Sequence, residues 1–142
     1  PAVSASKAGL VVAWFTGAAG KSAVRVAFGP LKGAFASPVA VDLGDPLGRV
    51  SVAWLDKGHA VVSFIDQAGS SDGQASLVAR VVAKDGSVGV PWLVAKTSAS
   101  NAAGFPRLVR AGEHLVWAWT DAASEGSAVR LAEARVDGLL PS

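Results

Sequence analysis

The chain has 142 residues, of which 51% are hydrophobic and 17% charged, enough apolar material for one folded domain. It has no cysteine, which excludes disulfides, a thiol nucleophile and cysteine-ligated metal sites. The net charge is only +2 and the basic residues are scattered, so no nucleic-acid binding is expected. The apolar run at residues 10–15 is far shorter than the roughly 20 residues that cross a bilayer, so no membrane span is expected.

The first third of the chain is typical of short β-strands. Val and aromatic residues dominate its apolar runs, and Gly, Ser and Lys-Gly breaks separate them. Between Val24 and Phe28 the apolar residues alternate with Arg25 and Ala27, which predicts a strand with one less buried face. The four expected strands are residues 2–6, 10–15, 23–28 and 39–41.

The middle third repeats this pattern with a longer Gly/Ser turn at residues 67–74. Asp85-Gly86 is a hairpin-type dipeptide, because Gly accepts the positive φ that such turns require. The four expected strands are residues 50–55, 60–65, 77–83 and 92–95.

The last third has three expected strands, at residues 107–110, 115–120 and 129–136. A fourth is not expected, because residues 139–142 are too short and contain a proline. An unpaired edge beside this gap would favour aggregation unless another chain covers it.

The three thirds are versions of one unit. Trp14, Phe64 and Trp119 lie near the ends of equivalent apolar runs, 50 and 55 residues apart, a period typical of stacked units such as propeller blades. The runs Val11–Phe15 and Leu115–Trp119 do not alternate, so we expect both of their faces to be covered. Their units should therefore lie between neighbouring sheets.

The sequence thus predicts an all-β fold of three β-propeller-type blades, at about residues 1–45, 46–99 and 100–142, the last one incomplete. Propellers usually have four to eight blades, so three cannot close a ring. Three alternatives follow: two copies pair as a homo-oligomer, another chain supplies the second half of the propeller, or the chain is a piece of a longer protein. The absence of Met and the start at Pro1, inside the repeat pattern, favour a processed or truncated N-terminus.

Several segments carry a family resemblance. They are Gly33-Ala34-Phe35-Ala36-Ser37-Pro38, Lys84-Asp85-Gly86 with Pro91-Trp92, and Gly104-Phe105-Pro106-Arg107-Leu108. Together they resemble the sialidase-like (BNR, or Asp-box) propeller repeats, although no complete box is present. The resemblance implies a six-bladed propeller, secreted or periplasmic, and in active members the cleavage of terminal sialic acid by a Tyr nucleophile. This chain has no Tyr, so we assign it no catalytic residue.

Five residues are candidate ligand-binding residues: Asp66, Asp121, Arg49, Asn101 and Arg107. In a propeller, the two aspartates would end equivalent strands on the face that also carries the loops at residues 42–49 and 97–107. Their carboxylates can bind ligand hydroxyls or, alternatively, cap their own turns by accepting backbone N–H groups.

No metal or cofactor is expected. His59 and His114 precede equivalent strands on the other face and lack an acidic cluster to complete a metal site. The acidic loop at residues 42–46 lacks the further oxygen ligands of a calcium loop. The segment Gly17–Ser22 contains Gly-Lys-Ser but precedes a strand, so it is interpreted as a hairpin turn rather than a phosphate loop. Most of the tryptophans are expected to pack between blades.

Two functions follow from this. The first is a non-catalytic, extracytoplasmic propeller segment that binds a glycan or a protein partner through its loops. The alternative is a fragment of a sialidase-like glycoside hydrolase whose nucleophile lies outside this chain.

Overall fold

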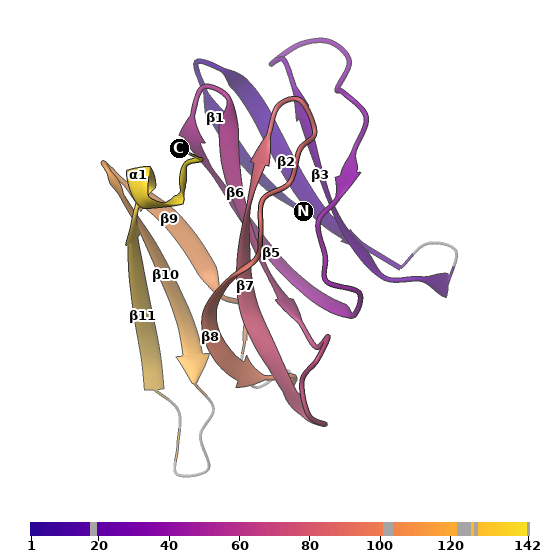
Figure 1. Ribbon diagram of the computed structural model, residues 1–142, viewed down its shortest axis with the longest axis vertical. Coiled ribbons are helices and arrows are strands. Elements are labelled where there is room, and N and C mark those ends of the chain that lie inside the picture. Colours follow the sequence, from indigo (N-terminus) through magenta and orange to yellow (C-terminus); the bar gives the residue numbers. More distant parts are fainter. Residues whose placement is uncertain (18–19, 101–103, 122–125, 127, 142) are drawn as a thin grey trace.

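The computed structural model describes residues 1–17, 20–100, 104–121, 126 and 128–141. In this part of the chain the fold is all-β, with three antiparallel sheets arranged one after another (Figure 1). Within each sheet the strands follow one another in chain order, so that every strand pairs with its sequence neighbour.

The first sheet contains β1 (Ala2–Ser6), β2 (Gly9–Thr16), β3 (Ala23–Gly29) and β4 (Val39–Ala40). The middle sheet contains β5 (Pro46–Asp56), β6 (His59–Asp66), β7 (Gln74–Ala83) and β8 (Trp92–Ser98). The last sheet contains β9 (Arg107–Ala111), β10 (His114–Asp121) and β11 (Ala128–Arg135), followed by one turn of helix, α1 (Val136–Leu139). The all-β class predicted from the sequence is therefore confirmed, while the closure of these sheets into a propeller ring stays a prediction.

Two details of the strands differ from the sequence prediction. Strand β5 begins at Pro46 rather than at Val50, and its pairing with β6 is irregular between Pro46 and Ser51. At the other end of the chain, Val136 was predicted to end a strand and instead begins α1, where it is buried together with Leu139. The side chains of Val136 and Leu139 therefore cover the hydrophobic core between the middle and last sheets.

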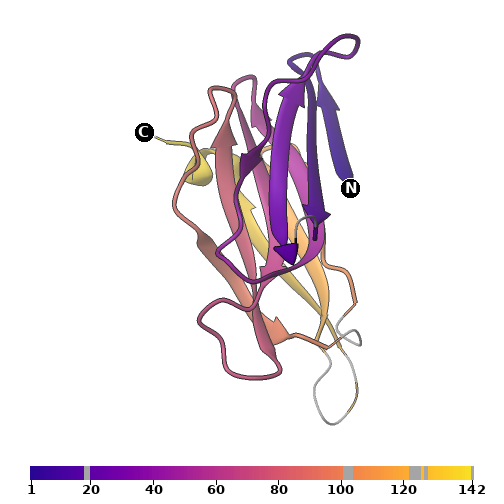
Figure 2. The same ribbon diagram turned by 90° about the vertical axis from the view of Figure 1, so that its right-hand side faces the viewer.

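The middle sheet separates two hydrophobic cores (Figures 1 and 2). One core lies between the first and middle sheets and includes Val11, Val26 and Phe64. The other lies between the middle and last sheets and includes Leu77 and Leu115. Strand β5 contacts both β1 and β9, so the first strands of the three sheets lie side by side.

The expectation that both outer runs are covered on both faces is wrong. In β2, Val11 and Ala13 are buried, whereas Val12 and Trp14 are only partly covered and Phe15 is 43% exposed. Strand β10 alternates in the same way. The fully covered strand is β6, whose residues 60–66 are all buried. The reason is that each outer sheet has only one neighbouring sheet in this chain, while the middle sheet has two.

Candidate binding site at the ends of the first strands

The connections after β2, β4, β6 and β8 lie at the same end of the sheets, the lower end in Figure 1. This is the end on which the sequence predicted the five candidate ligand-binding residues. Four of them are described by the structure; Asn101 lies outside the described residues.

Asp66 ends β6 and is 1% exposed. Its Oδ2 accepts the backbone N–H of Leu43 at 2.8 Å, and its Oδ1 accepts those of Ala68 at 2.8 Å and Asp45 at 3.3 Å. The carboxylate thus joins the β4–β5 connection to the β6–β7 connection. These contacts agree with the turn-capping alternative rather than with a group that reaches a ligand.

Asp121 ends β10, the equivalent strand of the last sheet, but its surroundings differ. Its side chain is 41% exposed and its Oδ2 lies 3.2 Å from Nε of Arg130 on the neighbouring strand. An exposed ion pair of this kind contributes little to stability. The structure does not bring Asp121 together with the other described candidates in a shared hollow.

Arg49 lies in the irregular part of β5, and its backbone has a φ of 56°. This left-handed conformation is unfavourable for a residue with a side chain, and such strain is found preferentially at functional positions. One guanidinium nitrogen, Nη2, donates to the carbonyl oxygen of Ser100 at 3.2 Å. The guanidinium carbon also lies 5.7 Å from the centre of the Phe105 ring, within the range of a cation–π contact.

The residue before Arg49 also has a left-handed backbone and lies against an aromatic ring. Gly48 has a φ of +87°, and a Cβ atom at this position would lie 2.9 Å from Cγ of Phe15. Only glycine therefore fits between the β5 backbone and this ring. The close approach places the aromatic end of β2 beside the irregular segment that presents Arg49.

Arg49 and Arg107 line one hollow, which we name the inner cleft. It has a volume of about 430 Å³. Its lining consists of Pro1, Phe15, Leu47, Arg49, Val50, Phe105, Pro106 and Arg107. Of these described residues, two are cationic and none is acidic. The structure therefore brings together two of the predicted candidates, from β5 and from the start of β9.

The inner cleft continues along β5. An adjoining hollow of about 300 Å³ shares Val50 and Arg107 with it and passes Ser51 and Val52 between β1 and β9. Ser51 is buried there, and its hydroxyl donates to the carbonyl oxygen of Pro106 at 3.2 Å. The floor of the groove is thus a bonded strand, while the charged groups lie at its lower end.

Chemically, the inner cleft suits an anion. A guanidinium donates paired N–H groups in the geometry that a carboxylate accepts. Apolar rings beside two such groups reduce the competition from water and so strengthen these hydrogen bonds. Phe105 is 73% exposed and offers a flat apolar face next to Arg49. Sequence reasoning did not identify Phe15 and Phe105 as part of a site, because only the bulge at Gly48 and Arg49 brings them together.

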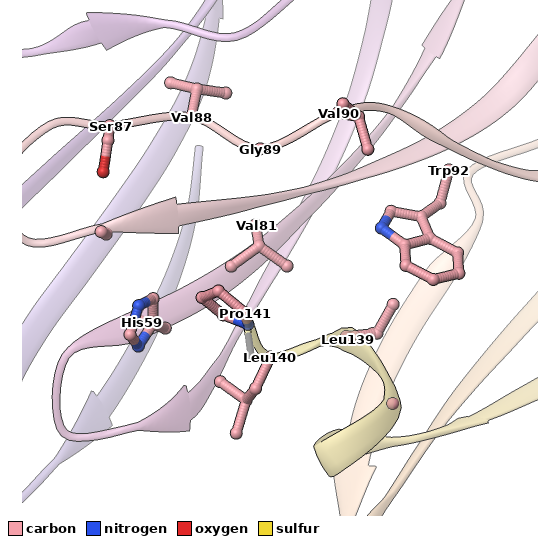
Figure 3. Close-up of a pocket in the computed structure, with 12 residues that line it drawn as sticks. His59, Val81, Ser87, Val88, Gly89, Val90, Trp92, Leu139, Leu140 and Pro141 are labelled. Atoms are coloured by element: carbon pink, nitrogen blue, oxygen red, sulfur yellow. The ribbon is translucent and has the colours of Figure 1, made fainter.

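A second hollow lies at the opposite end of the sheets, between the β7–β8 connection and α1 (Figure 3). It has a volume of about 390 Å³ and is mainly apolar, and Trp92 and Leu139 lie on one side of it. Trp92 is 46% exposed, in contrast to Trp54 and Trp117, which are buried as expected for packing between sheets. None of the candidate residues lies in this hollow.

His59, which also lines this second hollow, is paired with a carboxylate. Its Nδ1 lies 2.9 Å from Oδ1 of Asp56. Burial alone would raise the pKa of Asp56, but hydrogen bonds from the Gly58 amide and from His59 outweigh it, so the pKa of Asp56 is lowered. Among the described residues, no three His, Asp or Glu side chains are grouped as a metal site would require.

Across the described residues, no helix is both long and apolar enough to cross a membrane. Comparisons with models of protein families, with curated proteins and with solved structures find no match to this chain.

Proposed function

We propose that this chain is a non-catalytic propeller-type segment that binds a glycan or a protein partner bearing a carboxylate at the inner cleft. The observation that carries the proposal is the meeting of Arg49 and Arg107 in one hollow with the exposed ring of Phe105. Two cationic forks supply charge-assisted hydrogen bonds, and the ring supplies a stacking surface for a sugar or an apolar side chain.

The extracytoplasmic location and the propeller assignment belong to the same proposal. Both rest on the resemblance to sialidase-like repeats and on the repeated unit of the sequence. Three successive meander sheets with their first strands side by side are compatible with propeller blades.

The test measures binding of carboxylate-bearing and neutral ligands in parallel. Sialyllactose and lactose, and an acidic peptide and its amidated counterpart, would be titrated by calorimetry against the chain and its Arg49→Gln and Arg107→Gln variants. We expect the carboxylate-bearing ligand of one pair to bind, and each substitution to weaken it about tenfold or more, as the loss of a charge-assisted hydrogen bond predicts.

Arg130→Gln is the matched control, because the side chain of Arg130 on β11 is 60% exposed and lies outside the inner cleft. Equal binding of the neutral ligands, or full binding by both cleft variants, would contradict the proposal. A fluorogenic sialoside tests the alternative, in which the chain is part of a sialidase-like hydrolase. Turnover by the isolated chain would favour that alternative over a binding role.

A further inference from the structure

The outer faces of the first and last sheets carry apolar side chains, and no other sheet of the described residues covers them. On the first sheet, Val12 and Trp14 of β2 point away from the neighbouring core, and Val3, which pairs with Val12, is 64% exposed. We call this surface the first face. It lies on the side of the molecule opposite to the last sheet (Figure 1).

The last sheet has a similar uncovered surface, which we call the last face. In β10 it includes Val116 and Ala118, which pair with Val109 of β9 and Leu131 of β11, respectively. Val109 is 56% exposed and Leu131 is 69% exposed. Charged residues complete these two rows, since Val116 also pairs with Glu133 of β11 and Ala118 with Arg107 of β9. The last face is therefore mixed, with exposed apolar residues on all three strands, and the comparison of the repeats below identifies it as a contact surface.

Comparison of the three repeats shows that the first face and the last face correspond to opposite sides of the repeated sheet. Trp14, Phe64 and Trp119 occupy the same position of the three sheets. Phe64 packs into the core shared with the first sheet, and Trp119 packs against the core shared with the middle sheet. In both cases this side of the sheet therefore covers the sheet that precedes it. Trp14 lies on the same side of the first sheet, where no other sheet of the described residues covers it.

The opposite side of each sheet covers the sheet that follows. Val11 of the first sheet and Val61 of the middle sheet occupy one repeat position, and both are buried in the core shared with the next sheet. Val116 is the equivalent residue of the last sheet and lies on the last face. The first face and the last face are thus the two halves of a contact that occurs twice within the chain.

From this we infer that two copies of the chain associate head to tail, the last face of each covering the first face of the other. Such a contact joins different surfaces, so a first face does not pair with another first face. It continues the sheet-on-sheet packing already present twice in the molecule. Two copies provide six sheets, within the range in which such sheets close into a ring.

The internal contacts also indicate how strong the contact between copies is. Nε1 of Trp54 donates to the carbonyl oxygen of Ser4 at 3.1 Å, and Arg110 donates to the carbonyl oxygens of Trp54 and Leu55. Trp54 and Arg110 occupy one repeat position, and Ala5 is its equivalent in the first sheet. Because Ala5 has no side-chain donor, the contact between copies lacks this bond and is weaker than the internal ones.

The test uses one variant for each face. Val12→Glu places a charge on the first face and Leu131→Glu places one on the last face; Leu31→Glu, at a 76% exposed position outside both faces, is the control. Masses are measured by size-exclusion chromatography with light scattering. We expect the unchanged chain and the control to have about twice the 14.2 kDa of one copy, and each face variant to be monomeric.

Mixing the two variants gives the decisive result. In a mixture of equal amounts, the intact last face of the Val12→Glu copy meets the intact first face of the Leu131→Glu copy, so a dimer should return through one contact. A monomeric unchanged chain, polymers in place of a dimer, or no recovery on mixing would overturn the inference. Pairing of like faces would leave one of the two single variants dimeric, which overturns it equally.

Folding of the variants is checked by circular dichroism. If Val12→Glu is unfolded, Trp14→Ser replaces it, because this substitution removes apolar area from the same face without introducing a charge. The inference does not depend on ligand binding at the inner cleft. Arg49→Gln should weaken the proposed binding and leave the dimer intact, so the two failures can be told apart.

Discussion

Asp66 and Asp121 occupy the same position of two repeats, yet the structure gives them different roles. The first is a buried acceptor for three backbone N–H groups, and the second forms an exposed pair with Arg130. Identical residues at equivalent positions therefore do not imply an equivalent function. What differs is the connection beside each strand, which for Asp66 is the β4–β5 loop folded over its carboxylate.

We predict that Asp66→Asn lowers the free energy of unfolding by about 2 kcal/mol. The amide nitrogen that replaces one oxygen cannot accept a hydrogen bond, so a buried N–H group loses its partner. Urea denaturation at pH 7 measures the change. Asp121→Asn is the matched control and should lower the free energy of unfolding by less than about 1 kcal/mol, since exposed ion pairs are weak. Equal losses in the two variants would contradict this assignment.

At the same scale, the sequence identified part of the candidate site. It selected Arg49 and Arg107 because both follow or end loops on one face, and the structure brings them to one cleft. The rings of Phe15 and Phe105 were missed. Their approach depends on the left-handed backbone of Arg49 and the small volume of Gly48, and neither property leaves a pattern in hydrophobicity or spacing.

At the scale of elements, strand positions followed from the sequence and strand burial did not. Short Val-rich runs between Gly, Asp and Ser breaks mark where each strand lies, because these residues end strands locally. Which faces are covered depends on neighbouring sheets, which are not local. The runs of β2 and β6 are similarly apolar, yet only β6 has a sheet on both sides.

We predict that two Phe→Ala substitutions, one in a core between sheets and one at the end of a strand, differ in the stability that they remove. Phe64 is 0% exposed in the core between the first and middle sheets, so Phe64→Ala should lower the free energy of unfolding by about 3–5 kcal/mol. Phe15 is 43% exposed at the end of β2, so Phe15→Ala should lower it by about 1 kcal/mol. Chemical denaturation of both variants provides the comparison, and similar losses would contradict the difference in burial between the Phe15 and Phe64 rings.

At the scale of the whole molecule, the uncovered first and last faces connect stability to concentration. If two copies associate only when folded, association stabilises the folded state by mass action. We predict that the thermal midpoint rises by several degrees between about 1 and 100 μM protein, as measured by differential scanning fluorimetry. Val12→Glu should show a midpoint that does not change with concentration; a rising midpoint in this variant would place the association elsewhere.

Because the middle sheet is covered on both sides, its backbone amides should exchange hydrogen with solvent more slowly than those of the outer sheets. The backbone of β6 is bonded to β5 and β7 and lies beneath side chains on each face, so its N–H groups exchange only when the whole domain opens. Strands β1 and β11 are edge strands of the outer sheets, so their amides exchange through smaller local openings. Deuterium uptake by this chain should therefore be slowest near Val62 and faster in β1 and β11.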